Sequence, residues 1–585
     1  MLQAKRIIVF KNWLSRKITS QGKATSTTIP ERLAKLRAHF EKDEENGYVV
    51  PIFKKSILHA QRIAIKNYFS EYSYQQLYLG AKKLSVQISN ICGSGASCNI
   101  AAFCQNDALL PVTQWGCWMS GQVFVPLLHK LPHETLKYII YDSNTKLIIS
   151  AKEYEIIAKQ LTELFDIPLM VIDHNFMPEK SSSSRFLEKL LLTVGDNVFI
   201  EGTLNNDFYS CSDALLVYNT NGVEKPKGCI ITHKNLQSRI KTTSEVCNYE
   251  PTDFLLNLLP MDYSTYSVHS AMCLLSVGGK VTFYNDLDCK NIWSRILCIN
   301  VPTEDRPNIL TALPSSYIKI IHEYKIFPKN PRRDEYIKNY CLNNFRLMIS
   351  GPLPLPMNIY HYWNKLTGHK LLRYYETPET GAIISNPYFE NKQQKWQQTS
   401  VGLQLPQTSI RIANSKDEVE FAYKGSNFKN EWIENISQRL FFNEGLEPLV
   451  GELQVSGPII FKGYLNQRDA RMFFDNHLFK TGFIVKFENG VLILLRHKGD
   501  IVRSVGQSVS SGEIETSLQT HLKIKDVAVV GVPVNLENLQ TFCPKWLPTF
   551  IYLEMLQIIP DINRSSVSEI DKNLLTKLFL YSTGS

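Results

Sequence analysis

The stretch that decides the fold comprises residues 218–228, which read YNTNGVEKPKG. It lies between a predicted buried strand, Ala214–Tyr218, and a predicted helix that begins at His233, with Thr232 as its N-cap. A loop rich in hydroxyls and glycine that joins a strand to a helix can surround phosphate oxygens with backbone N–H groups, while a lysine offsets their charge. The stretch therefore indicates a phosphate-binding loop around Lys227, although Lys-Pro-Lys-Gly also occurs in ordinary basic turns.

Apolar strand-like runs alternate with helix-like stretches on both sides of this loop. From about Tyr48 onward the pattern is that of an α/β domain. The clearest predicted strands are Asn99–Cys104, Lys146–Ser150, Leu169–Ile172 and Arg346–Ser350.

A second, smaller domain is predicted near the C-terminus. Ser510 and Glu513 have the spacing of a capping box ahead of an amphipathic helix, and a strand is expected at Asp526–Val532. Strand, turn, capped helix and strand in this order predict a small α+β domain over residues 500–585.

Length and charge limit the classes of function. The chain has 585 residues, 44% of them hydrophobic, which is enough to bury a large core in more than one domain. The formal net charge is +9, but six basic residues lie in the first 30 positions, which leaves 9 − 6 = +3 for the rest. So small an excess suits an enzyme that handles phosphates and gives no case for a nucleic-acid partner.

The first 30 residues have the composition of a mitochondrial transit peptide. They contain no Asp or Glu, mix apolar with basic residues and are rich in Ser and Thr from Ser15 onward. A basic, disordered tail is the alternative. Because no apolar run reaches the roughly 18 to 20 residues that span a bilayer, we expect a soluble protein of the mitochondrial matrix.

Twelve cysteines are scattered from Cys92 to Cys543, without a Cys-x-x-Cys pair and without histidine spacing suited to a metal. Isolated cysteines in a reducing compartment are usually small buried apolar residues. The sequence therefore predicts neither a disulfide framework nor a zinc site.

The stretch at residues 218–228 resembles the acyl-CoA synthetase signature Y-T-S-G-T-T-G-x-P-K-G, with Tyr218, Pro226, Lys227 and Gly228 in matching places. Similarity to this adenylate-forming, AMP-binding family extends from about residue 88 to 575. The stretches most similar to malonyl-CoA synthetases are Gln114–Leu127, Arg346–Gly351, Trp363–Leu372 and Phe479–Gly482.

The resemblance implies a fold and a set of roles. The fold is a large N-terminal domain of stacked sheets and helices over residues 48–499, followed by the small domain, which is shorter than the family's and would be mobile. Thr220, Gly222 and Gly228 would hold ATP phosphates, and Lys227 would be catalytic. The implied cofactors are ATP, Mg²⁺ and CoA, and the implied substrate is a small carboxylic acid such as malonate.

A second motif lies at residues 375–381, YETPETG, which resemble the family's Y-G-M-T-E-x-G. The resemblance implies that Tyr375 packs on adenine and that Glu379 helps to hold Mg²⁺ against ATP. Gly381 also matches, whereas Glu376 replaces a glycine. The alternative for Glu379 is a solvated loop carboxylate.

A third motif is similar to the family's ribose-binding segment and hinge. Arg496 matches a ribose-binding position, and Asp500 matches the hinge about which the small domain turns. The two residues are also compatible with a plain surface ion pair.

Five replacements fall on positions to which the family assigns a role. Asn221 and Glu224 replace inner glycines of the phosphate loop, Pro378 replaces a threonine, Phe483 replaces the Asp that accepts both ribose hydroxyls, and Glu569 replaces the catalytic lysine. Losing one stabilising donor costs about 2.7 to 4 kcal/mol, or roughly 10²- to 10³-fold in rate. We therefore expect adenylation to be slow or absent.

Two hypotheses follow. The chain is either an ATP-dependent carboxylate–CoA ligase that forms an acyl-adenylate, or a degenerate paralogue that binds nucleotide, acyl-CoA or a protein partner without turnover.

Overall fold

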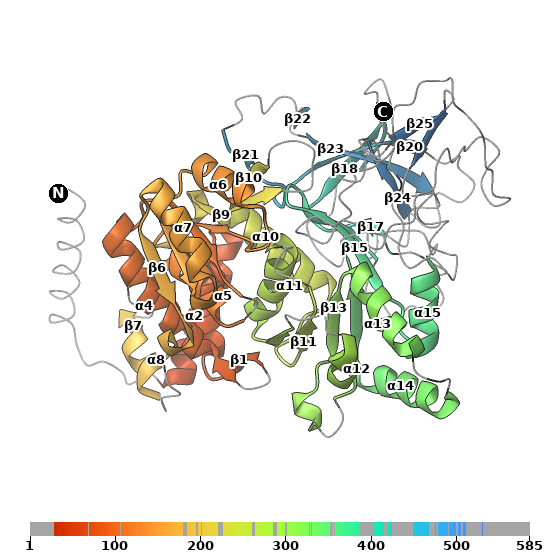
Figure 1. Ribbon diagram of the computed structural model, residues 1–585. Coiled ribbons are helices and arrows are strands. Elements are labelled where there is room, and N and C mark those ends of the chain that lie inside the picture. Colours follow the sequence, from red (N-terminus) through yellow and green to blue (C-terminus); the bar gives the residue numbers. More distant parts are fainter. Residues whose placement is uncertain are drawn as a thin grey trace.

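The computed structural model describes residues 28–67, 70–105, 107–178, 184–194, 197–200, 202–219, 226–259, 264–284, 289–298, 301–326, 328, 330–351, 355, 357–386, 402–414, 419–423, 449–466, 474–475, 478–488, 491–498, 501–504, 507–510 and 529. Three large sheets and the helices that cover them form most of this part (Figure 1).

The first sheet has the strand order β21-β10-β9-β4-β3-β5-β6. Its central strands are parallel, and β10 pairs antiparallel with both β9 and β21. The strands are β3 Asn99–Phe103, β4 Val123–Pro126, β5 Leu147–Ala151, β6 Leu169–Ile172, β9 Asp213–Asn219, β10 Lys227–Thr232 and β21 Gly463–Tyr464.

The second sheet has the order β17-β16-β15-β14-β13-β11-β12-β1-β2 and is parallel from β15 to β1. Its strands are β1 Ile63–Lys66, β2 Glu71–Ser73, β11 Phe254–Asn257, β12 Lys280–Phe283, β13 Ile309–Ala312, β14 Leu347–Ser350, β15 Leu372–Thr377, β16 Gly381–Ser385 and β17 Leu403–Gln404.

The third sheet is antiparallel, with the order β19-β18-β20-β23-β22 and β24 paired to β23. It lies beyond the ends of the other two sheets, at the top of Figure 1. Its strands are β18 Ser409–Ala413, β19 Val419–Tyr423, β20 Leu449–Ser456, β22 Phe474–Asp475, β23 Leu478–Glu488 and β24 Val491–His497; two hairpins lie outside the large sheets, β7 Leu191–Val194 with β8 Asn197–Ile200 and β25 Ile501–Ser504 with β26 Gln507–Ser510.

Fourteen α-helices are found in the described residues. They are α2 Ile29–Glu45, α3 Ile52–Lys55, α4 Tyr74–Cys92, α5 Leu109–Met119, α6 His133–Asp142, α7 Glu155–Phe165, α8 Ser184–Leu190, α9 Asn206–Cys211, α10 His233–Val246, α11 Ser264–Val277, α12 Cys289–Leu297, α13 Pro314–Ile326, α14 Pro331–Asn344 and α15 Met357–Thr367, and short 3-10 turns cover Ser56–His59, Lys152–Tyr154, His174–Phe176 and Thr303–Asp305.

The central strands of the first sheet are buried on both faces. In β3, Ile100 and Ala102 pack with α4 and α5, whereas Ala101 and Phe103 pack with α6 and α7. Because successive side chains of a strand point to opposite faces, a continuous apolar run such as this one requires helices on both sides.

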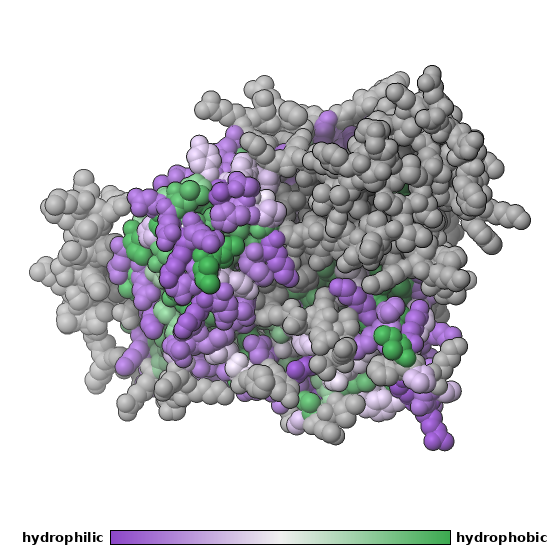
Figure 2. Space-filling view, viewed as in Figure 1, coloured by the Kyte–Doolittle hydropathy of each residue, from purple (hydrophilic) through white to green (hydrophobic). Residues whose placement is uncertain are grey.

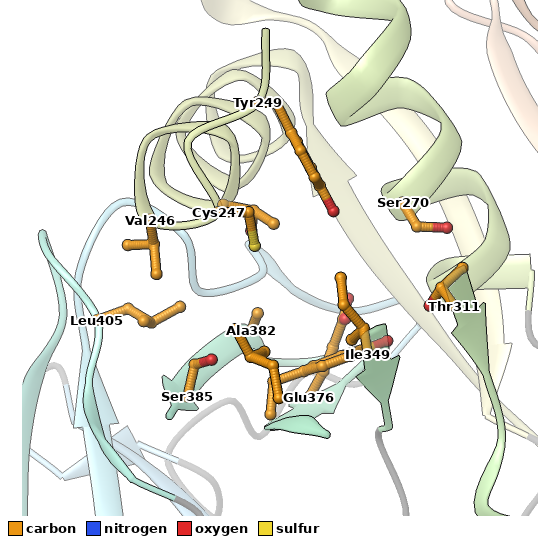
Figure 3. A pocket seen from close by; sticks show the side chains of 13 residues that line it. Val246, Cys247, Tyr249, Ser270, Thr311, Ile349, Glu376, Ala382, Ser385 and Leu405 are labelled. Carbon is orange, nitrogen blue, oxygen red and sulfur yellow. The ribbon is translucent and has the colours of Figure 1, made fainter. Parts of the chain in front are cut away.

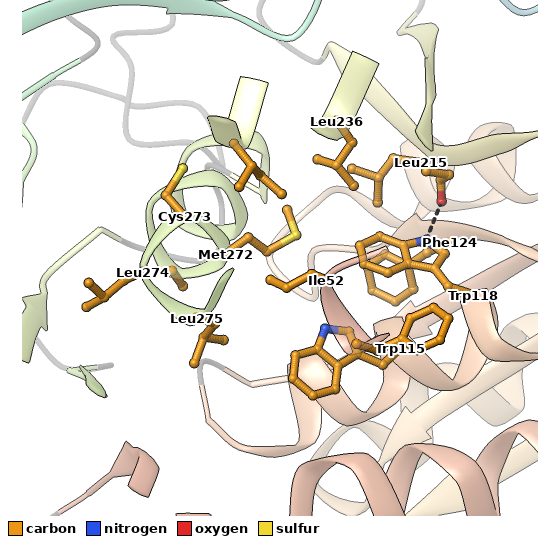
Figure 4. Packing of buried hydrophobic residues seen from close by; sticks show 14 of the residues in the cluster. Ile52, Trp115, Trp118, Phe124, Leu215, Leu236, Met272, Cys273, Leu274 and Leu275 are labelled. Carbon is orange, nitrogen blue, oxygen red and sulfur yellow. Dashed lines mark hydrogen bonds between the residues drawn. The ribbon is translucent and has the colours of Figure 1, made fainter. Parts of the chain in front are cut away.

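Helices α10 and α11 lie between the first two sheets and join their cores (Figures 1 and 4). Trp115 and Trp118 of α5 approach Met272 of α11 in one buried cluster, and the indole N–H of Trp118 donates to the carbonyl of Ala214 at 2.8 Å. This packing fixes the position of β9, and therefore of the strand that follows the phosphate loop.

The predicted α/β class and the strands expected at residues 99–104, 146–150, 169–172 and 346–350 are confirmed by β3, β5, β6 and β14. The N-cap of α10 is also confirmed, because the Thr232 hydroxyl accepts from the backbone N–H of Asn235 and the Asn235 side chain accepts in return. Helix α2 was not predicted. It precedes the expected domain start at Tyr48 and buries Leu36 and Phe40 in the core.

The predicted C-terminal helix and the strand at Asp526–Val532 lie outside the described residues, apart from Val529. The described residues 501–504 and 507–510 of this region form the β25–β26 hairpin, which ends at Ser510. The division at residue 500 and the truncation of the small domain therefore stay predictions.

Hydrophilic side chains cover much of the surface of α6 and α7 that Figure 2 shows, with apolar patches between them. Two of the most exposed large apolar residues, Tyr141 and Ile156, lie on these helices. None of the described helices is both long and apolar enough to cross a membrane.

Candidate active site

Strands β9 and β10 form the two sides of the predicted phosphate loop. Lys227 pairs with Asn219 and Gly228 with Tyr218, so the stretch is a β-hairpin. The expectation that the loop leads directly into a helix is wrong, because residues 227–232 pair along β9 before α10 begins. The N-terminus of α10 is therefore not the end of this loop.

The tip of the hairpin lies outside the described residues. Predicted phosphate ligands Thr220 and Gly222 belong to this tip, as do the replacements Asn221 and Glu224. Lys227, at the start of β10, is half-buried.

Gly228 is confined by its partner strand. A Cβ atom at this position would lie 3.1 Å from both Leu216 and the ring of Tyr218. The Tyr218 hydroxyl donates to the Asp142 carboxylate at 2.7 Å, and burial together with Asp142 raises the pKa of Tyr218. These contacts give Gly228 and Tyr218 a structural reason for their identity, independent of any ligand.

Glu379 lies in the turn between β15 and β16, near Cys229 of β10. Its side chain is 5% exposed, and its Oε1 atom accepts from the Tyr464 hydroxyl at 2.9 Å. Tyr464 belongs to β21 and pairs with Cys229, the second residue after Lys227. Burial raises the pKa of Tyr464, and Glu379 raises it further. The interpretation of Glu379 as a solvated loop carboxylate is wrong, because the carboxyl group is buried and hydrogen-bonded.

Arg239 of α10 holds the same turn from behind. Its guanidinium donates to the carbonyls of Ile459 at 2.8 Å, Pro378 at 3.0 Å and Glu379 at 3.3 Å. The side chain is 3% exposed; burial lowers its pKa to about 10, and the neighbouring carboxylates limit this shift. Gly381 has φ +63°, and a Cβ atom there would lie 2.7 Å from Arg239 Nε, so the motif needs a glycine at this position.

Within the turn, Thr377 and Thr380 are joined by two hydrogen bonds from backbone to side chain. Each backbone N–H donates to the other residue's hydroxyl at 3.2 Å. Pro378 has no N–H to donate, but its carbonyl is used by Arg239. The turn is therefore ordered despite the proline.

Tyr375 lies in an aromatic row with Phe483 of β23 and His497 of β24. The ring centroids are 5.1 Å apart for Tyr375 and Phe483 and 4.8 Å apart for Phe483 and His497, both edge-to-face. Tyr375 is 3% exposed, and its hydroxyl has no hydrogen-bond partner in the described part of the chain. Phe483 thus packs on the tyrosine that the resemblance assigns to adenine.

Arg496 has its backbone in β24, opposite Ile484 and next to the Phe483–His497 pair. The structure does not describe its side chain. The predicted hinge Asp500 and the replacement Glu569 lie outside the described residues. The sheet therefore brings the backbone of Arg496 to the aromatic row but leaves its role as a prediction.

A pocket opens beside this motif (Figure 3). Its cavity volume is about 30 Å³. Figure 3 shows Val246, Cys247 and Tyr249 on one side and Glu376, Ala382 and Ser385 opposite them. The other lining residues are Thr243, Ser270, Thr311, Ile349, Leu372, Tyr374 and Leu405.

The described side chains contain no group of three or more His, Cys, Asp or Glu suited to a metal. Mg²⁺ is often bound by one or two carboxylates plus substrate phosphates, and Glu379 fits that mode.

Arg239 and Tyr464 were missed by sequence reasoning. Arg239 lies 139 residues from Pro378, and Tyr464 lies 85 residues from Glu379. No local pattern connects positions so far apart, although Tyr464 lies in a Lys-Gly-Tyr segment that follows a short apolar run.

The hairpin, the buried Glu379 turn and the adjoining pocket all lie within the part of the chain that matches one enzyme family. The chain belongs to the AMP-binding enzyme family, whose sequence profile matches residues 54–465. The resemblance to adenylate-forming acyl-CoA synthetases is thereby confirmed.

Relatives with similar sequences include malonate–CoA ligases. The chain is 29% identical over 504 residues to "Malonate--CoA ligase ACSF3, mitochondrial" of Xenopus laevis, covering 85% of this chain and 82% of the relative. It is 26% identical to the Homo sapiens protein of the same name, covering 90% and 92% of the two chains.

Solved structures share the fold. ATP-bound MatB from Rhodopseudomonas palustris has a TM-score of 0.68 at 20% identity, covering 90% of this chain and 98% of that one. MenE from Bacillus subtilis in complex with AMP has a TM-score of 0.67 at 17% identity, covering 90% and 97%.

Proposed function

We propose that this protein is an ATP-dependent carboxylate–CoA ligase of the malonyl-CoA synthetase type, acting on a small carboxylic acid such as malonate in mitochondrial fatty-acid metabolism. The observation that carries the proposal is the buried Glu379 carboxylate, held by Tyr464 against the strand that begins with Lys227. A buried carboxylate is retained where it is hydrogen-bonded or meets a cation, and Mg²⁺ with ATP supplies that cation in the proposed reaction.

In this proposal each motif has a separate task. Lys227 and the hairpin tip bind ATP phosphates, Glu379 binds Mg²⁺ and Arg496 contacts the ribose. The substrate carboxylate attacks the α-phosphate of ATP and pyrophosphate leaves. After the small domain turns about Asp500, the CoA thiol attacks the acyl carbon of the adenylate, the acyl–phosphate bond breaks, and AMP leaves as the thioester forms. Protein groups mainly position the reactants and stabilise developing charge.

The proposed division of the chain is a transit peptide over residues 1–30, a large domain over 48–499 and a mobile small domain over 500–585. A transit-peptide composition and relatives whose names include "mitochondrial" support a location in the matrix. Import of the full chain into isolated mitochondria, with removal of its N-terminal segment, is the expected result.

Adenylation by this protein is proposed to be slow. Phe483 offers no acceptor for ribose hydroxyls, and its ring packs on Tyr375. With Glu569 at the lysine position, two stabilising groups are lost, which corresponds to about four to six orders of magnitude if the effects add. Thiolation of an adenylate depends less on that lysine.

The test is exchange of labelled pyrophosphate into ATP, catalysed by the full chain with a panel of short acids that includes malonate. We expect slow, acid-dependent exchange that falls at least about 10²-fold in Lys227→Ala. Lys462→Ala is the matched control, because Lys462 is exposed and its ammonium pairs only with Asp213 among the described residues. Exchange that is absent with every acid, or unchanged in Lys227→Ala, contradicts the proposal.

A second candidate function is that of a binding protein without turnover. The aromatic contact of Phe483 with Tyr375 favours it, because this contact fills space beside the ring assigned to adenine. Without exchange, stabilisation of the fold by ATP, CoA or malonyl-CoA in a thermal-shift measurement would support this second function.

A further inference from the structure

Asp142, the last residue of α6, contacts chain segments on both sides of β10, the strand that begins with Lys227 (Figure 1). Its Oδ2 atom accepts a hydrogen bond from the Tyr218 hydroxyl of β9 at 2.7 Å. Its backbone carbonyl and its Oδ1 atom accept from the side-chain amide of Asn466, just beyond β21, at 3.1 and 3.3 Å. Asp142 therefore joins two segments that are distant in the sequence and that both pair with β10.

The position of this carboxylate has an electrostatic cost. The C-terminal end of a helix carries partial negative charge from its unpaired carbonyls, so a carboxylate is disfavoured there. Tyr218 and Asn466 offset this cost by donating hydrogen bonds to Asp142, and Tyr138, one turn earlier in α6, also hydrogen-bonds to it. An acidic side chain at this end of α6 is thus explained by the segments that it holds.

On one side of β10, Asp142 fixes the ring of Tyr218. Tyr218 is 9% exposed and pairs with Gly228, the residue after Lys227. The ring covers Gly228, because a Cβ atom there would lie 3.1 Å from the Cζ atom of Tyr218. Since the hydroxyl is attached to that same Cζ atom, its bond to Asp142 holds the ring over the start of β10.

On the other side of β10, Asn466 ends the segment that carries Tyr464. The backbone N–H of Leu465 donates to the carbonyl of Gly228 at 2.7 Å, so this segment extends the pairing of β21 to the same glycine. Asn466 has φ +59°, a region that asparagine enters at lower cost than most residues. The bonds from its amide group to Asp142 fix this turn, and therefore the strand that carries Tyr464.

The opposite end of β10 has a weaker link between the same two strands. There the Lys462 ammonium pairs with the Asp213 carboxylate at 2.9 Å, and Lys462 is exposed. Exposed ion pairs contribute little to stability, whereas a hydrogen bond from a buried hydroxyl to a carboxylate is strong. The firmer of the two links therefore lies at the end of β10 that carries Lys227.

We propose that Asp142 is a positioning residue, which holds the two strands beside β10 so that Lys227 is in place before ATP arrives. The inference rests on the proposed ligase function and adds a residue that lies outside the phosphate, adenine and ribose motifs. Asp142 acts through Tyr218 and Asn466 and touches no reactant.

The consequence for ATP binding follows from the order of the strand. ATP binds the ordered form of β10, so its apparent dissociation constant equals the intrinsic constant divided by the fraction of chains in that form. Loss of Asp142 lowers this fraction and weakens binding. Once ATP is bound the strand is ordered, so the turnover rate of the bound complex stays nearly unchanged.

The test is ATP binding by the full chain, measured by isothermal titration calorimetry with Mg²⁺ and without an acid substrate. Asp142→Ala should raise the dissociation constant for ATP at least about tenfold. Asp142→Asn keeps an accepting oxygen and should bring the constant back to within about threefold of the unaltered chain. In pyrophosphate exchange, Asp142→Ala should raise the KM for ATP by the same factor and change kcat by less than about threefold.

Hydrogen–deuterium exchange separates positioning from a general loss of stability. In Asp142→Ala, the backbone amides of residues 227–232 should exchange at least about tenfold faster, whereas those of Asn99–Phe103 in β3 should keep their rates. Saturating ATP should restore slow exchange in residues 227–232, because binding selects the ordered form. Equal acceleration in both strands would overturn the inference, since Asp142 would then support the whole fold.

Glu134→Ala is the matched control, because it removes an exposed carboxylate from the first turn of the same helix, where Glu134 pairs with Lys137. Its affinity for ATP should stay within about twofold of the unaltered chain. Tyr218→Phe carries the test if Asp142→Ala fails to fold, since it removes only a hydroxyl, and it should weaken ATP binding at least about threefold. Unchanged ATP affinity in Asp142→Ala and in Tyr218→Phe overturns the inference.

The two proposals fail in different ways. ATP binding that depends on Asp142, without pyrophosphate exchange for any acid, would remove the ligase function and keep the positioning role. Acid-dependent exchange with the same KM for ATP in Asp142→Ala as in the unaltered chain would keep the ligase function and remove the role of Asp142. A chain that binds no ATP overturns both.

Discussion

The candidate site has two walls, and they differ in the chemistry of their side chains. The turn that carries Glu379 is a buried polar network, in which Tyr464 and Arg239 satisfy the carboxylate and the turn carbonyls. The wall formed by β23 and β24 is aromatic, with Phe483 between Tyr375 and His497. A polar network loses stability when any one member is removed, whereas an aromatic ring can fill a position formerly occupied by a ligand-binding group.

The comparison predicts that the polar wall is the more sensitive to substitution. Arg239→Ala should lower the free energy of unfolding by about 3 to 5 kcal/mol, because it leaves buried carbonyls and two buried carboxylates without their shared cation. Urea denaturation followed by circular dichroism measures this change.

Arg332→Ala is the control for loss of an arginine, since Arg332 is exposed on α14. Its effect should stay within about 0.5 kcal/mol. A similarly small effect of Arg239→Ala would mean that the turn does not depend on its buried cation.

The sequence predicted strands β3, β5, β6 and β9 of the first sheet because their apolar runs are continuous and bounded by polar segments, as in Asn99–Phe103. It also located Glu379, Tyr375 and Gly381, because the motif is local. The pairing of residues 227–232 with β9 was not predicted, since a short apolar run does not reveal its partner strand.

The contacts that give the site its character could not be predicted from the motifs. The buried carboxylate of Glu379 accepts a hydrogen bond from Tyr464, which lies on β21, 85 residues further along the chain. Phe483 could be recognised as the loss of an acceptor, but not as a ring packed on Tyr375, because that depends on how the third sheet meets β15. The side-chain environment of Glu376 likewise follows from the meeting of α10, α11 and the second sheet.

Tyr464→Phe tests one hydrogen bond of the polar wall without a large change in volume. The free energy of unfolding should fall by about 1 to 3 kcal/mol, because the buried carboxylate of Glu379 loses a donor. Tyr336→Phe removes the same hydroxyl at a position that is 49% exposed and should be nearly neutral. Equal effects of the two variants would show that the hydroxyl of Tyr464 contributes nothing to the turn.

Phe483→Asp changes the aromatic wall back toward the family motif. The new carboxylate should accept ribose hydroxyls and tighten ATP binding by about tenfold, measured by isothermal titration calorimetry. Stability should fall at the same time, because two edge-to-face contacts worth about 0.5 to 1.5 kcal/mol each are lost.

Phe483→Leu separates the two consequences of that change, since it removes the ring without adding an acceptor. If the site lacks only a hydrogen-bond acceptor, Phe483→Asp raises the affinity for ATP, whereas Phe483→Leu leaves this affinity near that of the unaltered chain. If Leu tightens ATP binding as much as Asp does, the gain comes from emptying the space beside Tyr375, and Phe483 acts as an occluding side chain. Tighter ATP binding by Phe483→Leu would mean that the Phe483 ring blocks the nucleotide site, because removing a ring improves binding only if the ring was in the way. A site that only lacks a hydrogen-bond acceptor would gain nothing from this substitution.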